Sequence, residues 1–290
     1  MFHKYLVLLK LIAIIFVASL FLNYCYIQGF QVSSDSKPSN NLATAINTTA
    51  NTRQMNKIPP QTAQASALPH SNPAPVSIPI LMYHEIGDGP NSLYVADQDF
   101  AEQMQYLYNN GYQVVSLAQA SKMLFEGQAS SKVVALTFDD GYVSFYTKVW
   151  PLLKKLNFSA TVFVITDFCG SYKYLSWEQI KEMDHCGIEI GCHTKSHPSL
   201  PTLDSAGLTQ QIHESKLLLE QNGLQIESFC YPSGQYNNST VNQVINSGFK
   251  TAVTTQYAIA SSKSSPYLLP RVRVSRCTSL ENFQNSIVIY

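Results

Sequence analysis

Two adjacent carboxylates, Asp139 and Asp140, follow a short apolar run at residues 133–138 and precede Gly141. Such a run is typical of a buried parallel strand, and the carboxyl ends of these strands are where α/β folds place their chemistry. Carboxylates there can bind a metal ion or accept a proton. Neighbouring side chains of a strand point to opposite faces, so the two acids are expected to have different roles unless the chain bends, as Gly141 permits. The alternative is an ordinary Asp-Asp-Gly turn in which both acids accept hydrogen bonds from loop amides.

A second group with metal-binding side chains is the pair His193 and His197, which follows a predicted strand at 188–192. On a helical turn, a spacing of four residues places both imidazoles on one face. A single histidine pair is a common chance pattern, but here it accompanies the Asp139–Asp140 pair at another strand end. One carboxylate and two imidazoles make a metal site that leaves positions open for water and substrate.

The elements that must position these residues alternate between strands and helices. Apolar runs bounded by turn residues predict strands, and apolar stripes with helical spacing predict helices. The predicted strands are 78–83, 113–116, 133–138, 160–165, 188–192, 228–231, 250–254 and 271–274. The predicted helices are 97–110, 117–125, 144–156, 176–185, 204–222, 239–247 and 280–286, and Pro151 is expected to kink or divide the third. The alternation predicts an α/β fold with a mostly parallel sheet, and the number of repeats favours a closed or nearly closed (β/α) barrel.

The first 75 residues differ in composition from the rest. Residues 1–30 combine a basic start, with Lys4 and Lys10, and an uncharged apolar run from Leu11 to Phe30. This pattern is typical of a signal anchor or signal peptide and, by the positive-inside rule, places the remainder of the chain outside the cytoplasm. We favour a membrane anchor with an exported domain, and cleavage would give a secreted protein instead. Residues 31–75 are rich in Ser, Asn, Thr, Gln and Pro and predict a disordered linker.

The folded domain is expected to span residues 76–290, and its composition argues against one class of partner. Charged residues make up 13% of the chain and the formal net charge at pH 7 is zero. A nucleic-acid-binding domain usually carries a basic patch or stripe. We therefore expect no nucleic-acid partner.

Three motifs together resemble the polysaccharide deacetylases of the NodB-homology type, carbohydrate esterase family 4. They are Thr-Phe-Asp-Asp-Gly at 137–141, His-Thr-x-x-His at 193–197 and Phe-Cys-Tyr-Pro-Ser-Gly at 229–234. The third motif and the opening Pro-Ile-Leu-Met-Tyr-His-Glu at 79–85 are closer to the branch that includes the deacetylases of poly-N-acetylglucosamine biofilm polymers. The resemblance covers about residues 76–290 and implies a distorted (β/α) barrel.

The resemblance implies a role for each residue that matches a family motif. Asp140, His193 and His197 match the ligands of one divalent metal ion, which we expect to be Zn²⁺. Asp139 matches the general base that takes a proton from the attacking water.

Four further residues are implied at the substrate side of the site. Tyr231 matches the position whose backbone N–H helps to hold the oxyanion, and Pro232 shapes that loop. The arginine that usually begins the third motif is missing, and Arg271 is expected to replace it in orienting the base. The late histidine segment of the family is also missing, which makes His84 of the early Tyr-His motif the expected general acid. The alternative for His84 is a structural one, in which it hydrogen-bonds a buried carbonyl at a strand end.

These roles imply a metal-dependent hydrolase that removes N-acetyl groups from an N-acetylglucosamine-containing polysaccharide, either an exopolysaccharide or peptidoglycan. An O-acetyl esterase that acts on xylan-like glycans would use the same site. A glycosidase needs two carboxylates about 5 to 9.5 Å apart that face one bond, which adjacent strand residues supply badly. A catalytically inactive glycan-binding module would not need the complete Asp-His-His set.

Overall fold

The computed structural model describes residues 75–127 and 132–289, which lie within one compact unit. The predicted anchor at 1–30 and all but the last residue of the predicted linker at 31–75 lie outside the described residues. No helix within the described ranges is long and apolar enough to cross a membrane.

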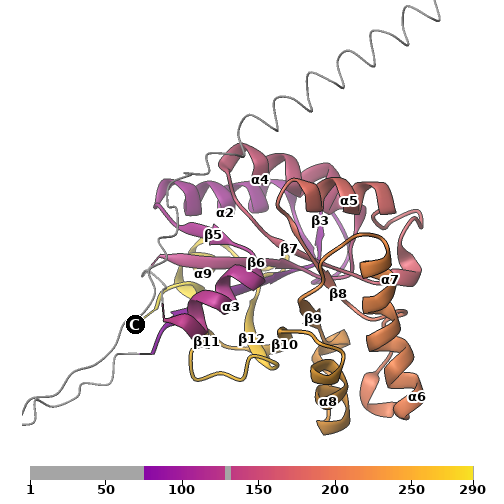
Figure 1. Ribbon diagram of the computed structural model, residues 1–290. Coiled ribbons are helices and arrows are strands. Elements are labelled where there is room, and N and C mark those ends of the chain that lie inside the picture. Colours follow the sequence, from indigo (N-terminus) through magenta and orange to yellow (C-terminus); the bar gives the residue numbers. More distant parts are fainter. Residues whose placement is uncertain (1–74, 128–131, 290) are drawn as a thin grey trace, which may run out of the picture. The chain divides into compact units, whose positions relative to one another are not determined.

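Seven parallel strands close into a barrel, with helices packed around it (Figure 1). Their order is β2-β12-β10-β9-β8-β7-β6, and β6 pairs with β2 to complete the ring. The strands are β2 (Ile80–Tyr83), β6 (Val133–Phe138), β7 (Thr161–Val164), β8 (Glu189–Cys192), β9 (Ser228–Cys230), β10 (Thr251–Tyr257) and β12 (Leu269–Arg273). The predicted (β/α) barrel is thus confirmed.

The barrel is distorted where β5 (Gln113–Val115) joins it. One edge of β6 is shared, because β5 pairs with residues 133–135 and β7 pairs with residues 137–138. The pairing of β10 with β12 also shifts register between Val253 and Tyr257. Such irregularities increase the local twist and occur often at barrel rims and beside active sites.

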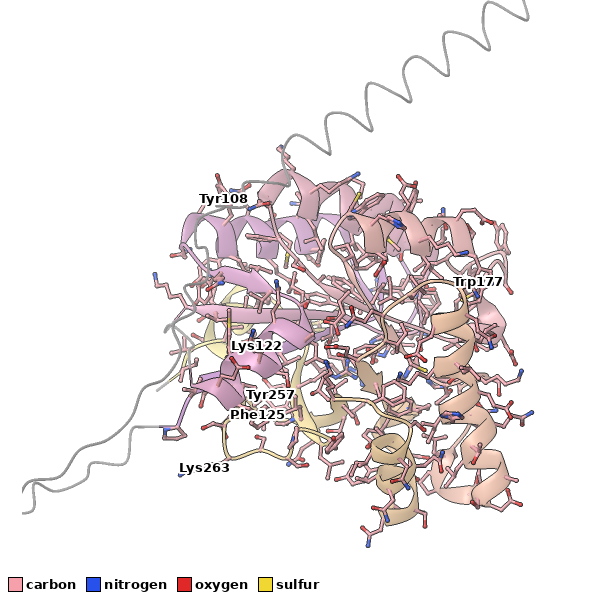
Figure 2. The ribbon with its side chains drawn as sticks, in the orientation of Figure 1. Tyr108, Lys122, Phe125, Trp177, Tyr257 and Lys263 are labelled. Atoms are coloured by element: carbon pink, nitrogen blue, oxygen red, sulfur yellow. The ribbon has the colours of Figure 1, made fainter. Side chains whose placement is uncertain are left out.

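The helices begin and end at the signals that the sequence carries. They are α2 (Asp97–Asn109), α3 (Leu117–Glu126), α4 (Trp150–Leu156), α5 (Trp177–His185), α6 (Ser205–Leu208), α7 (Ser215–Gln221), α8 (Asn238–Asn246) and α9 (Leu280–Ser286). Capping boxes at Ser116 and Ser176 open α3 and α5. Trp177, the first residue of α5, is partly buried and packs against the core (Figure 2).

Two predicted helices contain π-helical turns, which the apolar spacing did not indicate. The helix predicted at 144–156 consists of η1 (Phe145–Val149) and α4, and the division falls beside Pro151, which has no N–H to donate. The helix predicted at 204–222 consists of α6, η4 (Thr209–Glu214) and α7. Three short 3-10 turns complete the helical elements: η2 (Thr166–Phe168), η3 (Leu200–Thr202) and η5 (Pro232–Gly234).

The strand predicted at 78–83 is interrupted at Pro79, for the same reason. The residues before it form β1 (Ser77–Ile78), which pairs with β11 (Ala260–Ser261). The short pair β3 (Glu85–Ile86) and β4 (Tyr94–Val95) was not predicted.

Side chains alternate along β6 between the helix-facing core and the barrel interior. Val134, Leu136 and Phe138 belong to the larger core between strands and helices, whereas Val133 and Ala135 belong to the smaller core inside the barrel. The period of two therefore directs Thr137, and after it Asp139, into the barrel. In β12 the interior residue Leu269 gives the same direction to Arg271. The fold thus brings the carboxylate of Asp139 and the guanidinium of Arg271 into the barrel interior at the same end.

Candidate active site

All the residues that the sequence singled out gather at the carboxyl end of the barrel. Asp139 and Asp140 follow β6, the two histidines follow β8, and His84 follows β2. Arg271 lies within β12, and Tyr231 and Pro232 follow β9 directly. Because parallel strands end at the same rim, residues that are up to 187 positions apart, from His84 to Arg271, become neighbours.

Asp139 is held by Arg271 through two parallel hydrogen bonds. The guanidinium donates to Oδ1 and to Oδ2 over 2.7 Å each, and both side chains are almost fully buried. Burial alone would raise the pKa of Asp139, but the charge and hydrogen bonds of Arg271 outweigh it and hold that pKa well below its ordinary range. Asp139 is therefore ionised at neutral pH.

Arg271 is 0% exposed, and hydrogen bonds to its surroundings hold it in place. Its remaining N–H groups donate to the Thr254 carbonyl (2.9 Å), Thr137 Oγ1 (3.1 Å) and Cys230 Sγ (3.3 Å). All five guanidinium N–H groups thus have a partner, which is what a buried arginine requires. The sequence prediction that Arg271 orients the aspartate agrees with this geometry.

Asp140 reaches the same site because the backbone bends at Asp140 itself. A regular strand would direct it away from the side of Asp139. Asp140 and Gly141 instead have φ values of 71° and 75°, in the left-handed region. At Gly141 an added Cβ would lie 3.1 Å from Val164 Cγ1, so a larger residue would be both strained and crowded. The bend places Asp140 Oδ1 3.4 Å from His193 Nε2 and 3.7 Å from His197 Nε2.

His193 is oriented by a hydrogen bond to the backbone of β9. Its Nδ1 lies 2.7 Å from the Cys230 carbonyl oxygen, which can only accept, so Nδ1 carries the proton. Nε2 is then left as the free nitrogen that faces Asp140. An imidazole held in this way is typical of metal-binding histidines.

The loop that carries both histidines is not the helical turn that the spacing suggested. Residues 193–197 form an irregular loop in which Thr194 and His197 have φ values of 69° and 60°. Thr194 Oγ1 accepts a hydrogen bond from the His197 N–H over 3.0 Å and closes this loop. The two imidazole rings still meet, with centroids 4.8 Å apart, because the left-handed residues fold the chain back.

The carboxylate and the two imidazoles fit one metal ion. The ligand atoms of Asp140, His193 and His197 all lie within 4.8 Å of one another. Tetrahedral Zn²⁺ with bonds of about 2.0–2.1 Å separates its ligand atoms by about 3.3 Å, and the two carboxylate–imidazole distances of 3.4 and 3.7 Å are close to this.

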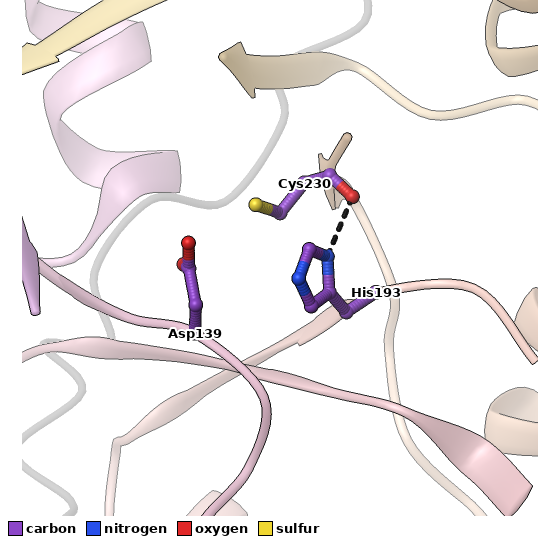
Figure 3. A group of neighbouring side chains, drawn as sticks. All are labelled: Asp139, His193 and Cys230. Carbon is purple, nitrogen blue, oxygen red and sulfur yellow. Dashed lines mark hydrogen bonds between the residues drawn. The ribbon is translucent and has the colours of Figure 1, made fainter. Parts of the chain in front are cut away.

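The ligand atoms of a second set, Asp139, His193 and Cys230, also lie within 4.8 Å of one another (Figure 3). Arg271 donates to the carboxylate of Asp139 and to the sulfur of Cys230, so both are already occupied by a cation. Burial also raises the pKa of the Cys230 thiol, which disfavours the thiolate that a metal needs. The set with Asp140 is therefore the one that fits a metal.

His84 also lies near Asp139, with its Nε2 3.8 Å from Oδ2 and its side chain 13% exposed. Burial lowers its pKa, against the attraction of Asp139 and Asp140. His84 is consequently neutral in the free protein at pH 7 and has no charge of its own to bury.

Tyr231 differs from the sequence expectation. Its backbone N–H donates to the Val253 carbonyl over 3.2 Å, which continues the ladder between β9 and β10, so it is not free to hold an oxyanion. Pro232 begins the turn Pro232–Gly234, closed by a bond from the Gly234 N–H to the Tyr231 carbonyl. Gly234 can have no side chain, because a Cβ would meet Thr255 Oγ1 at 2.0 Å.

Sequence reasoning missed three residues at the site. The Cys230 carbonyl orients His193, as described above. Tyr142 lies against Asp140, whose charge adds to the effect of burial in raising the tyrosine pKa, and its ring stacks on Tyr174 at 5.2 Å. Tyr142 comes directly after the Asp-Asp-Gly motif, which was the available signal, whereas nothing in the sequence marks Tyr174.

Comparison with known proteins finds relatives that are described as deacetylases. The family model for polysaccharide deacetylases matches residues 126–252, a range that includes the two aspartates and the two histidines but neither His84 nor Arg271. A Bacillus subtilis protein named "Putative polysaccharide deacetylase YxkH" is 39% identical over 203 residues, which cover 69% of this chain and 72% of the relative. The poly-beta-1,6-N-acetyl-D-glucosamine N-deacetylase of Staphylococcus epidermidis is 28% identical over 196 residues, 62% of this chain and 68% of the relative.

A solved structure extends the similarity to the fold. The deacetylase PplD of Streptococcus pyogenes, in complex with acetate, superimposes with a TM-score of 0.70 at 33% identity. The match covers 74% of this chain and 99% of that one.

Proposed function

The chain belongs to the polysaccharide deacetylase family, hydrolases of the amide C–N bond in N-acetylated sugars, and from this premise we propose a metal-dependent N-deacetylase of N-acetylglucosamine polymers. The observation that carries the proposal is the convergence of Asp140, His193 and His197 beside a separate, arginine-held aspartate. Three ligands leave room for water and substrate, and a fourth group is available for proton transfer.

The chemistry begins with the attack of water on the acetyl carbon. A divalent metal, which we propose is Zn²⁺, would acidify that water and polarise the acetyl carbonyl when bound to Asp140, His193 and His197. Asp139 accepts the proton of the water. Because Arg271 lowers the pKa of Asp139, the carboxylate is a weak base, and it works only on a water that is already acidified.

His84 supplies the proton that the leaving amine needs. An amine anion is too basic to leave, so the nitrogen must be protonated as the C–N bond breaks. His84 Nε2 lies 3.8 Å from Asp139 Oδ2, so a proton taken by Asp139 can be passed on to it. Since the Tyr231 N–H is occupied by the Val253 carbonyl, that amide is not available to the oxyanion, and a bound metal would supply the positive charge there.

The substrate that we propose is an N-acetylglucosamine polymer, with an exopolysaccharide first and peptidoglycan second. The Staphylococcus epidermidis relative, a poly-beta-1,6-N-acetyl-D-glucosamine N-deacetylase, supports the first choice. The acetate bound to the Streptococcus deacetylase is the acid that such a reaction releases. We further propose that residues 1–75 hold the domain on the outer side of the cytoplasmic membrane, where these polymers occur.

Defined oligomers test the proposed reaction. Incubation of the full chain with β-1,6- and β-1,4-linked N-acetylglucosamine oligomers should release acetate and an equal amount of primary amine, measured by enzymatic acetate assay and mass spectrometry. The matched control is Asp139→Asn, which should release neither. Acetate without new amine from an O-acetylated glycan would indicate the esterase instead, and no acetate from any oligomer at saturating Zn²⁺ would refute the proposal.

The location has a separate test. A reporter that is active only outside the cytoplasm, fused after residue 75, should be active in cells. Activity of a cytoplasmic reporter at the same position would contradict the proposed export.

A further inference from the structure

A pocket of about 400 Å³ opens at the carboxyl end of the barrel, next to the site. It lies between the ends of β10 and β12 and one face of α9. Its lining is mostly polar and consists of Tyr257, Arg273, Cys277, Thr278, Asn282, Asn285 and Ser286. A larger pocket of about 550 Å³ lies at the opposite end of the barrel and includes the ion pair of Glu227 with Lys250, so it cannot share a substrate with the site.

The 400 Å³ pocket is close to the two residues proposed to transfer protons. Arg273 comes two residues after Arg271, which holds Asp139, and it pairs in the sheet with Met82, two residues before His84. The Val274 N–H donates to the Met82 carbonyl over 3.0 Å and continues this ladder. After burial and the two aspartates, the charges of Arg271 and Arg273 also act on the pKa of His84. Arg273 thus links the pocket to the surroundings of His84, and a polymer bound at the site can extend towards it.

The lining combines one positive charge, from Arg273, with neutral groups that both donate and accept hydrogen bonds. Asn282 and Asn285 contribute amides, Thr278 and Ser286 contribute hydroxyls, and no carboxylate lines the pocket. Tyr257 at the rim is 66% exposed and has a ring on which a sugar could stack. The positive charge of Arg273, with no carboxylate beside it in the lining, suits an anionic oxygen group better than a neutral hydroxyl.

Arg273 differs from Arg271 in having no acidic partner. Among the described residues it forms no salt bridge, and its one hydrogen bond is a long one of 3.4 Å to Ser92 Oγ. Arg271, two residues earlier, uses all five of its donors within the protein. The guanidinium of Arg273 is thus available to a ligand, and its fork matches carboxylate and phosphate oxygens.

We propose that this pocket is a subsite for an anionic group, a carboxylate or a phosphate, on the sugar next to the one that loses its acetyl group. Arg273 binds the charge, and Asn282 and Asn285 donate to its oxygens. The inference rests on the proposed deacetylase function and reverses the order of substrates given there, because it places acidic N-acetylated glycans such as peptidoglycan ahead of a neutral exopolysaccharide. A neutral homopolymer leaves Arg273 without a partner.

Three oligomers of equal length test the subsite. One is neutral N-acetylglucosamine, one alternates N-acetylglucosamine with N-acetylmuramic acid, which carries a carboxylate, and one carries a 6-phosphate on the neighbouring sugar. Their affinities for the full chain are measured by calorimetry, and their kcat/KM values by acetate release. The variants are Arg273→Gln and, as a control, Lys263→Gln, which removes the same charge from an exposed residue beyond β11 (Figure 2).

We expect at least one anionic oligomer to bind about fivefold more tightly than the neutral one, the size expected of a partly exposed ion pair. Arg273→Gln should abolish this ratio, and Lys263→Gln should keep it. We compare the ratio of the affinities of the anionic and neutral oligomers, because an effect of Arg273 on His84 would change the values for all oligomers alike and leave this ratio unchanged. Whether the carboxylate or the phosphate oligomer shows the preference identifies the source of the charge.

Two results would overturn the subsite: equal affinity for the neutral and both anionic oligomers, or a preference that survives Arg273→Gln. A failure of the deacetylase proposal has a different signature. In that case binding would still depend on Arg273, but no oligomer would release acetate.

Discussion

Each end of the barrel holds a carboxylate through hydrogen bonds, and the two are held in different ways: Asp139 is buried, whereas Glu189 is half-buried. At the amino end Glu189, the first residue of β8, accepts hydrogen bonds from the Ala118 N–H (2.8 Å), Thr161 Oγ1 (2.7 Å) and Ser228 Oγ. All three donors are neutral. At the carboxyl end Asp139 is held by the Arg271 guanidinium. The neutral donors link neighbouring elements through Glu189. The buried Arg271 cation also lowers the pKa of Asp139 and so keeps this carboxylate ionised.

The backbone differs between the two ends as well. Glu189 lies in a regular strand, but Asp140, Thr194 and His197 have left-handed φ values, and these are three of the five such non-glycine residues in the described ranges. Each such residue costs about 1–3 kcal/mol and persists where its surroundings enforce it. The strain collects where the metal-binding atoms converge. One end of the barrel thus serves stability and the other serves chemistry.

The largest effect should come from the two aspartates at the carboxyl end. Asp139→Asn should lower kcat by about 10²–10⁴-fold, because an amide cannot accept the proton of the water, while bound metal is retained. Asp140→Asn should lose metal and turnover together. Steady-state kinetics and metal analysis of both variants make the comparison. If Asp139→Asn lost the metal and Asp140→Asn kept it, the two roles would have to be exchanged.

Removal of the buried cation should destabilise the fold. Arg271→Met leaves Asp139 buried without a partner, so we expect the free energy of unfolding in urea to fall by about 3–5 kcal/mol. The control is Arg276→Met, an exposed arginine that donates to the Gly89 carbonyl and should matter by about 0.5 kcal/mol or less. Equal effects of the two variants would show that the Asp139–Arg271 pair is not important for stability.

The same pair predicts a dependence of stability on pH. The folded protein holds the pKa of Asp139 below the unfolded value of about 4, so the stabilisation is complete above that pH. It is lost as the pH falls further towards the folded pKa. The unfolding free energy of the wild type should therefore decrease below about pH 4 more steeply than that of Arg271→Met. Parallel curves for the two proteins would contradict the pKa shift.

The smallest effect should come from the amino end. Glu189→Gln replaces one acceptor oxygen by an NH₂ group that cannot accept, so the unfolding free energy should fall by about 1–2 kcal/mol. Because Glu189 lies at the end of the barrel away from the site, kcat and metal content should stay unchanged. A loss of turnover in the folded variant would show that the two ends are not independent.

The sequence predicted the barrel strands and the residues that meet at the site, but not the left-handed backbone of the loop that brings His193 and His197 together. The alternation of apolar runs predicted the barrel, and the motifs identified Asp139, Asp140, His193 and His197 as one group. The family resemblance proposed Arg271 as the residue that orients the base, and in the structure its side chain points into the barrel and donates to Asp139. The apolar alternation and the motifs are local patterns, which a sequence displays directly.

The remaining features depend on tertiary contacts. The left-handed conformations of Thr194 and His197 have no signal in residue type, since neither is a glycine. The Cys230 carbonyl that orients His193 comes from another strand, and the Tyr231 N–H is taken by Val253 of a third. Backbone groups carry no identity in a sequence, so their partners appear only in the folded chain.

The central claim is that Asp140, His193 and His197 hold one divalent metal ion, and metal analysis tests it most directly. Wild-type protein, His193→Ala and His185→Ala are purified in parallel and their bound metal is measured by mass spectrometry. His185 is an exposed histidine on α5, bonded to the Lys181 carbonyl, and serves as the control. The account predicts about one ion per chain in the wild type and in His185→Ala, and almost none in His193→Ala. Unchanged metal content in folded His193→Ala would contradict it.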